Sequence, residues 1–196
     1  IPELLNSPKI SVASTAPLNQ WAHDTAKALS NAEDKIFANA DNTMGWQPLI
    51  FWYKKPGYDD VTEAVDKALH KLPAIAQRST GSFCTPGFET GCMSYGNNAW
   101  NDAQAMLFAG TFGVNVLDSS SGYTKNGNNI LDAFFDLVDV DGVFDGSIHG
   151  FTNYDVPQIA RGLDAFIRQY EKTSSFWEFT DVTVPTKKVN NMILAL

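Results

Sequence analysis

Apolar residues recur at intervals of three and four in several separate parts of this chain, and this spacing constrains the fold more than any other feature. In an α-helix the spacing collects apolar side chains on one face, which must then pack against another element. The pattern predicts five helices, over residues 18–40, 59–77, 98–108, 130–138 and 156–172. Pro73 is expected to kink the second helix or end it early, because proline lacks the backbone N–H that a helix needs.

A second pattern predicts a small β element beside these helices. Residues 46–54 are dense in aromatic and branched side chains and predict a short strand or extended segment, interrupted near Pro48. Residues 176–184 alternate in strand fashion, and residues 189–196 are suited to pair with them. Residues 118–129, rich in Ser, Gly and Asn, predict an exposed loop. The expected fold class is therefore α+β, predominantly helical, with about five helices and two or three short strands.

Size and composition favour one globular domain over residues 1–196. The chain is 44% hydrophobic, which is enough for a single core, and it contains no repeat or low-complexity linker. Its 14 basic and 22 acidic side chains give a formal net charge of −8, so no nucleic-acid partner is expected. The longest apolar runs, such as residues 49–53, fall far short of the roughly 20 residues that span a bilayer. No transmembrane segment is expected.

The only two cysteines, Cys84 and Cys92, bracket seven residues that include Pro86 and two glycines. This spacing predicts a disulfide bond that closes a small loop, and such bonds persist mainly outside reducing compartments. A zinc site needs about four ligands, and the three histidines are too widely spread to complete one. The chain also begins Ile1-Pro2 without an initiating methionine, as expected if a targeting segment had been removed. We therefore expect a secreted, extracellular protein.

Two carboxylates near this loop are candidates for catalysis. Glu89 lies inside the loop, and Asp102 lies just past it at the expected start of a helix. Hydrolysis of a glycosidic bond requires two carboxyl groups in unlike surroundings, one protonated and one ionised. Glu89, beside aromatic residues, is expected to be the acid, and the helix dipole is expected to keep Asp102 ionised. The aromatic residues suited to stacking on a sugar are Trp46, Trp52, Tyr95 and Trp100.

The alternative for both carboxylates is structural, with Glu89 a solvated loop residue and Asp102 an ordinary residue of a first helical turn. The tryptophans have a similar alternative, because several of the aromatic residues fall on apolar helix faces and suit core packing. Residues 46–53 are expected to form the most exposed aromatic surface, because so many large side chains in succession are hard to bury together.

An acidic segment indicates a candidate calcium site formed by Asp139, Asp141 and Asp145. Hard cations favour clustered carboxylates on a turning loop. The EF-hand pattern fails, however, because aligning Gly142 with its invariant glycine leaves Leu137 at the first position and Ile148 at the twelfth, where acidic ligands are needed. The sequence therefore leaves open either a calcium or sodium site of another kind or a solvated turn.

Common catalytic signatures are missing from the sequence. It contains no Gly-x-Ser-x-Gly elbow, Walker loop, His-Glu-x-x-His or Cys-x-x-Cys motif. His23 and Asp24 are adjacent on the first expected helix, and adjacent helical residues do not face each other, so they are not expected to form a dyad.

Two hypotheses of function follow. The first is a secreted protein that binds a glycan or another small polar ligand and hydrolyses the glycan with Glu89 and Asp102. The second is a non-enzymatic secreted toxin, effector or surface-binding module, whose aromatic segment engages a partner or a membrane surface.

Overall fold

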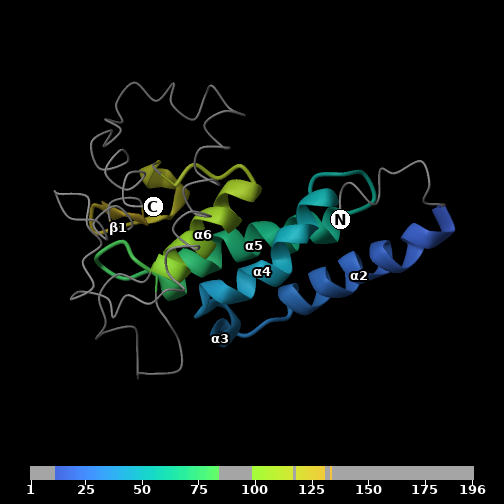
Figure 1. Cartoon of the computed structure of the whole chain (residues 1–196), viewed down its shortest axis with the longest axis horizontal. Helices are drawn as coiled ribbons and strands as arrows, with labels where there is room; N and C mark the ends of the chain where they lie inside the picture. The colour runs from blue at the N-terminus through green and yellow to red at the C-terminus, as the bar shows by residue number, and fades with distance from the viewer. Residues whose placement is uncertain (1–11, 84–98, 117, 131–132, 134–196) are drawn as a thin grey trace.

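The computed structural model describes residues 12–83, 99–116, 118–130 and 133, and these residues are mostly helical (Figure 1). The predicted helix at 18–40 is found as two helices, α2 (Val12–Ser30) and α3 (Asp34–Phe37). The predictions at 59–77 and 98–108 are confirmed as α5 (Asp59–Ala76) and α6 (Ala99–Thr111). The predicted helices at 130–138 and 156–172 and the strands at 176–184 and 189–196 lie outside the described residues, apart from residues 130 and 133.

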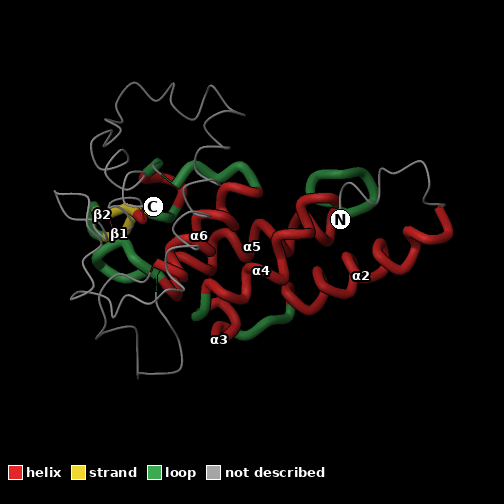
Figure 2. The backbone as a smooth tube through the Cα atoms, viewed as in Figure 1, coloured by secondary structure: helices red, strands yellow, loops and turns green. Residues whose placement is uncertain are grey.

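The longest helices, α2 and α5, pack against each other, and Figure 2 shows α5 between α2 and α6. Among the residues of α2 whose burial is described, those that are buried are Ala22, Ala26 and Leu29. Polar contacts hold the C-terminal end of α2 and the start of α3. The Lys67 ammonium on α5 donates to the carbonyl of Ser30, and Lys71 lies 2.6 Å from the Asp34 carboxylate. A buried apolar seam with polar ends therefore fixes this helix pair.

Pro73 does not end α5, which continues to Ala76. Because proline has no N–H, one carbonyl of the preceding turn has no helical partner. The carbonyl of the proline itself can still accept a hydrogen bond. The carbonyl of Pro73 accepts from the backbone N–H of Gln77 at 3.2 Å, and the proline ring is buried. The early end expected at Pro73 is therefore wrong, whereas the alternative of a kink stays a prediction. The helix extends into the turn that precedes Cys84.

The expectation of a strand at 46–54 is also wrong. The segment forms a short helical turn, α4 (Thr43–Trp46), and a 3-10 helix, η2 (Gln47–Phe51), preceded by another 3-10 turn, η1 (Ala40–Asn42). Its buried residues are spaced by three, with Trp46, Leu49 and Trp52 only 8%, 0% and 1% exposed. A strand would have buried every second residue instead. Aromatic composition suggested a strand here, whereas the apolar spacing is helical.

Helix α6 is buried on more than one side and packs against η1, α4 and α5. Its buried apolar residues are Ala103, Ala105, Met106, Phe108 and Ala109. The helix ends at Thr111, and Gly113 follows with φ of 76°, a left-handed conformation common after a helix C-terminus. The polar residues Asn101, Asp102 and Gln104 are buried on the same helix, and Asp102 lies at the centre of the candidate site.

The expected loop at 118–129 contains a 3-10 turn, η3 (Ser119–Ser121), and a small antiparallel hairpin of β1 (Thr124–Lys125) and β2 (Asn128–Asn129). The two strands are joined by Asn126 and Gly127, with φ of 54° and 82°. Positive φ at both positions is what a two-residue hairpin turn requires, and Asn-Gly is its strongest sequence signal. The expectation of a loop is therefore refined: the Asn-Gly pair at 126–127 is the sequence signal for this hairpin.

Candidate functional site

Of the two predicted catalytic carboxylates, the structure describes Asp102 and not Glu89. Asp102 lies in the first turn of α6 and is fully buried. The hydroxyl of Ser82 lies 3.0 Å from both carboxylate oxygens, and the backbone N–H of Phe83 donates to Oδ1 at 2.7 Å. Ser82 and Phe83 are themselves buried. The carboxylate therefore connects α6 to the last two described residues before Cys84.

Burial raises the pKa of Asp102 to about 8, because a desolvated carboxylate loses the stabilisation of water. The Phe83 N–H, the Ser82 hydroxyl and the charge of Arg78 act in the opposite direction, but desolvation is the largest effect. Asp102 is thus held as a neutral acid over much of the physiological range. The expectation that the helix dipole keeps it ionised is wrong, because loss of hydration outweighs the partial charge at a helix N-terminus.

The residues that Asp102 holds belong to a tight turn after α5. Gln77 and Phe83 form an isolated antiparallel bridge. Between them, the N–H of Arg78 donates to the carbonyl of Ser82 at 2.8 Å, and the N–H of Gly81 donates to the carbonyl of Arg78 at 3.0 Å. Gly81 has φ of 92°, which residues with a Cβ rarely adopt. The sequence therefore folds back on itself here and brings Ser82 and Phe83 to Asp102.

The hairpin holds the same turn from another direction. The side-chain amide of Gln77 donates to the carbonyl of Tyr123 at 2.7 Å, and the Lys125 ammonium donates to the carbonyl of Gln77. Asn128 on β2 donates to the carbonyl of Ser79 at 2.8 Å. The turn is therefore held by α6 through the carboxyl group of Asp102. It is also held by hydrogen bonds between the turn and residues 123–128, each of which ends on a backbone carbonyl. We call this set of contacts, formed around residues 77–83 by Asp102, Tyr123, Lys125 and Asn128, the Asp102 anchor.

This geometry suits a structural role better than catalysis. A catalytic carboxyl must approach its substrate within hydrogen-bonding distance, and Asp102 is 0% exposed with its oxygens bonded to neighbouring residues. The anchor instead connects Phe83 to the first turn of α6, the described parts of the chain that precede and follow residues 84–98. Those intervening residues contain Cys84, Glu89, Cys92 and Tyr95, which lie outside the described part of the chain. The disulfide bond and the roles of Glu89 and Tyr95 stay predictions.

Two of the four predicted sugar-stacking residues are core residues. Trp46 packs against Phe37 and Phe108, with ring centroids 5.7 and 5.8 Å away. The indole N–H of Trp52 donates to the side chain of Asn19 at 2.9 Å. The expectation that this segment exposes these two rings is wrong, because the three-residue spacing turns both of them inward. A buried ring cannot stack on a sugar, so Trp46 and Trp52 are not ligand-binding residues of the proposed site.

The roles of the other residues expected to bind a ligand or a metal stay predictions. Trp100 is the second residue of α6, and Tyr95 lies outside the described residues. The candidate calcium ligands Asp139, Asp141 and Asp145 lie outside them as well. Within the described residues, no group of three or more His, Cys, Asp or Glu side chains is placed to hold a metal ion.

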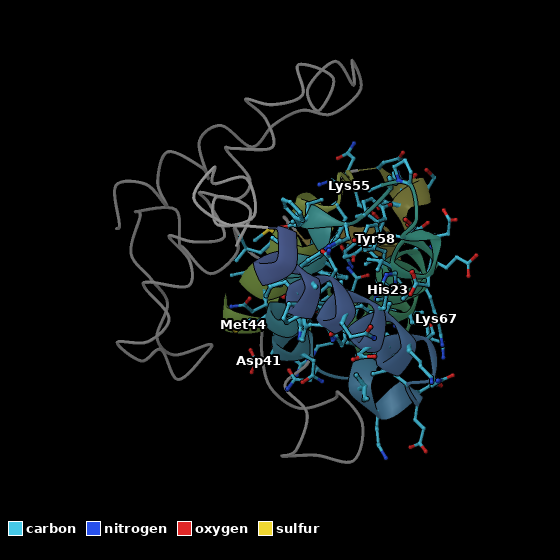
Figure 3. All side chains as sticks on the ribbon, turned by 90° about the vertical axis from the view of Figure 1, so that its right-hand side faces the viewer. His23, Asp41, Met44, Lys55, Tyr58 and Lys67 are labelled. Carbon is cyan, nitrogen blue, oxygen red and sulfur yellow. The ribbon has the colours of Figure 1, made fainter. Side chains whose placement is uncertain are left out.

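A surface pair that the sequence did not predict joins α2 to the start of α5. His23 Nδ1 lies 2.7 Å from Asp60 Oδ2, and the His23 ring stacks on Tyr58 at 4.9 Å between centroids (Figure 3). The sequence neighbour Asp24 does not face His23 and accepts a hydrogen bond from Gln20 at 3.0 Å. His23 and Asp60 are 37 positions apart in the sequence, which explains why local spacing did not reveal the pair.

Within the described residues, no helix is both long enough and apolar enough to cross a membrane. Comparisons with known proteins add no family to this description: no family model matches the chain, and neither a curated protein nor a solved structure shows significant similarity to it.

Proposed function

We propose that this chain is a secreted protein that binds a glycan or another polar ligand through residues 84–98, and that Asp102 anchors those residues without acting in catalysis. The observation that supports the proposal is the complete burial of Asp102 together with its hydrogen bonds to Ser82 and Phe83. Fixed residues on either side of a ligand-binding segment in the sequence reduce the entropy that is lost on binding.

The ligand class rests on the sequence of residues 84–98. They include Glu89 and Tyr95, a carboxylate and an aromatic ring, and are rich in Gly, Ser, Thr and Asn. Polar recognition of a sugar uses hydrogen-bonding groups beside an aromatic surface, and polar sites of this kind are held on loops by a rigid scaffold. Under this proposal the protein binds a glycan, as the first sequence hypothesis states, but Glu89 and Asp102 do not hydrolyse it.

The test is binding to immobilised neutral, acidic and amino-sugar polysaccharides, with release of reducing sugar measured on the same samples. We expect the wild type to bind at least one polysaccharide without hydrolysing it and Glu89→Gln to weaken that binding. Glu63→Gln on the exposed surface of α5 is the matched control and should bind as the wild type does.

Asp102→Asn separates the two roles. Asparagine keeps an acceptor oxygen for Ser82 and Phe83 but cannot exchange a proton with a substrate. Under the proposal this variant still binds polysaccharide at pH 7. If instead the wild type releases sugar and both Glu89→Gln and Asp102→Asn abolish that release at unchanged melting temperature, the hydrolase hypothesis replaces the proposal. Absence of binding to every polysaccharide contradicts the glycan class.

A specific observation also favours the surface-binding alternative, which we propose as the second candidate. Trp21 is 37% exposed on α2, and its ring lies 5.9 Å from Trp52, which contacts Phe51 at 5.2 Å. The Lys55 ammonium lies 3.6 Å from the centre of the Phe51 ring, and Ile50 is 36% exposed. Exposed aromatic, aliphatic and cationic side chains are typical of proteins that bind the membrane interface.

Sedimentation with vesicles of anionic and zwitterionic phospholipid tests this second candidate. Wild-type protein should sediment with anionic vesicles, and Trp21→Ala should weaken that association. Asp59→Asn, at an exposed position of the first turn of α5, is the control for altered charge alone. The net charge of −8 opposes a nonspecific attraction to anionic lipid, so sedimentation with anionic vesicles would indicate specific binding. Equal, weak sedimentation with both vesicle types contradicts membrane binding.

A further inference from the structure

The contact between His23 and Asp60 fixes which nitrogen of the imidazole carries a proton. Asp60 lies in the first turn of α5, and its side chain is 49% exposed to water. An ionised carboxylate only accepts hydrogen bonds, so His23 must donate through Nδ1 at 2.7 Å. In the neutral imidazole the lone pair then lies on Nε2. The pair therefore presents a proton-accepting nitrogen.

The ring of His23 is held in place as well as held in one tautomer. It stacks on Tyr58 with an interplanar angle of 10°, and the Tyr58 backbone is itself fixed. The N–H of Tyr58 donates to the carbonyl of Lys55 at 3.1 Å, and its carbonyl accepts from both the backbone N–H and the hydroxyl of Thr62. The His23 side chain remains 38% exposed. An oriented imidazole is thus accessible to solvent.

We propose that His23 is a general base for ester hydrolysis and that Asp60 is its positioning residue. A histidine whose Nδ1–H is held by a carboxylate is oriented to accept a proton at Nε2, and the carboxylate stabilises the imidazolium that forms. The residues involved are on α2 and α5, whereas the Asp102 anchor involves α6 and the hairpin. This activity is therefore separate from the proposed binding function.

The reaction step balances with water as the only co-reactant. His23 Nε2 takes a proton from a water molecule while the water oxygen forms a bond to the ester carbonyl carbon. The bond from that carbon to the alcohol oxygen then breaks, and the leaving group departs with the electron pair. The imidazolium of His23 finally releases its proton to solvent. A small ester with a good leaving group is the substrate class suited to a base on an open surface.

The experiment measures hydrolysis of p-nitrophenyl acetate by the full chain. We expect the wild-type rate to exceed that of His23→Gln by about tenfold, which is less than the 10²–10⁴ that acid and base groups contribute in complete active sites. Asp60→Asn should lose most of this difference while His23 is still present. His70→Gln is the matched control: His70 is also exposed on a helix, and within the described residues no carboxylate forms an ion pair with it. It should leave the rate unchanged.

A second measurement needs no variant and so does not depend on folding. Diethyl pyrocarbonate acylates neutral histidine nitrogens, and mass spectrometry of the modified wild-type protein should show His23 reacting faster than His70 if the pair with Asp60 makes Nε2 available. The proposal is overturned if wild type and folded His23→Gln hydrolyse the ester equally, if Asp60→Asn retains the full rate, or if His23 reacts no faster than His70.

Discussion

Asp102 loses its hydration on burial and gains two neighbouring hydrogen-bond donors. The balance of these two effects sets the pKa of its carboxyl group. Desolvation favours the neutral acid, while the Phe83 N–H and the Ser82 hydroxyl favour the carboxylate. Desolvation is the larger effect and raises the pKa to about 8. The folded protein therefore keeps a proton on Asp102 at pH values where the unfolded chain, with a carboxyl pKa near 3.8, has lost it. The buried group thereby couples folding to pH.

This coupling predicts how stability changes with pH. Between about pH 4 and 8 the native state binds one proton more than the unfolded state, so the free energy of unfolding falls as pH rises. The fall for one proton is at most about 1.4 kcal/mol per pH unit. Asp102→Asn removes the titrating group and should flatten the profile relative to the wild type. Urea unfolding at pH 5, 6, 7 and 8 checks this, and parallel profiles for the two proteins would contradict it.

The sequence predicts the helices that carry Asp102 and His23 but not the residues that contact their side chains. Asp102 could be placed at a helix start from its neighbours alone, yet its pKa depends on Ser82 and Phe83, which a turn of the backbone brings to it. His23 could be placed on α2, yet its partner Asp60 is on another helix. Local spacing predicts which face of a helix a residue occupies. It does not predict what the fold places against that face.

At the scale of elements, periodicity was the better guide and composition the poorer one. The helices α5 and α6 follow from apolar residues spaced by three and four, and both were predicted close to their observed bounds. The aromatic-rich residues 46–54 predict a short strand or extended segment from their β-forming composition. The structure buries residues 46, 49 and 52 on one side of a helical turn, so tertiary packing overrode β propensity.

Two adjacent substitutions test this helical spacing. Leu49 is fully buried and Ile50 is 36% exposed, although both are large and aliphatic. Leu49→Ala should lower the free energy of unfolding by about 2–5 kcal/mol through lost burial and a cavity. Ile50→Ala, the control, should lower it by less than about 1 kcal/mol. Chemical denaturation measures both. Similar losses from the two variants would mean that the segment does not bury every third residue.

The hairpin turn allows a test of backbone conformation by itself. A Cβ at Gly127 or at Gly45 would meet no atom within 4 Å, but Gly127 has φ of 82° and Gly45, within α4, does not have a positive φ. Gly127→Ala should destabilise the protein by about 1–2 kcal/mol because L-residues disfavour the left-handed region. Gly45→Ala should stabilise it by up to about 1 kcal/mol through helix propensity. Thermal unfolding of both variants decides the matter, and a neutral Gly127→Ala would argue against the two-residue turn.

For the whole molecule, a chain of aromatic contacts connects elements that are distant in the sequence. Trp46 contacts Phe37 on α3 and Phe108 on α6, and Phe108 contacts Phe112 at 5.2 Å. Phe112 contacts Tyr53 at 5.1 Å. The hydroxyl of Tyr53 in turn donates to Asp66 on α5 at 2.7 Å. Because these contacts run through one hydrophobic cluster, the described elements are expected to fold as a unit. The single domain over residues 1–196 stays a prediction.

Phe108 lies at the middle of that chain of contacts and is fully buried, so its truncation tests cooperativity. Phe108→Ala should lower the free energy of unfolding by about 3–5 kcal/mol, because it leaves a cavity between α4 and α6. Far-ultraviolet circular dichroism follows the helices, and tryptophan fluorescence follows the five tryptophans of the chain, of which Trp46 and Trp52 are buried in the core. If one core joins these elements, both signals should change at the same denaturant concentration in the wild type and shift together in the variant. A variant that moves the fluorescence transition and leaves the helical transition in place would show that the elements unfold separately.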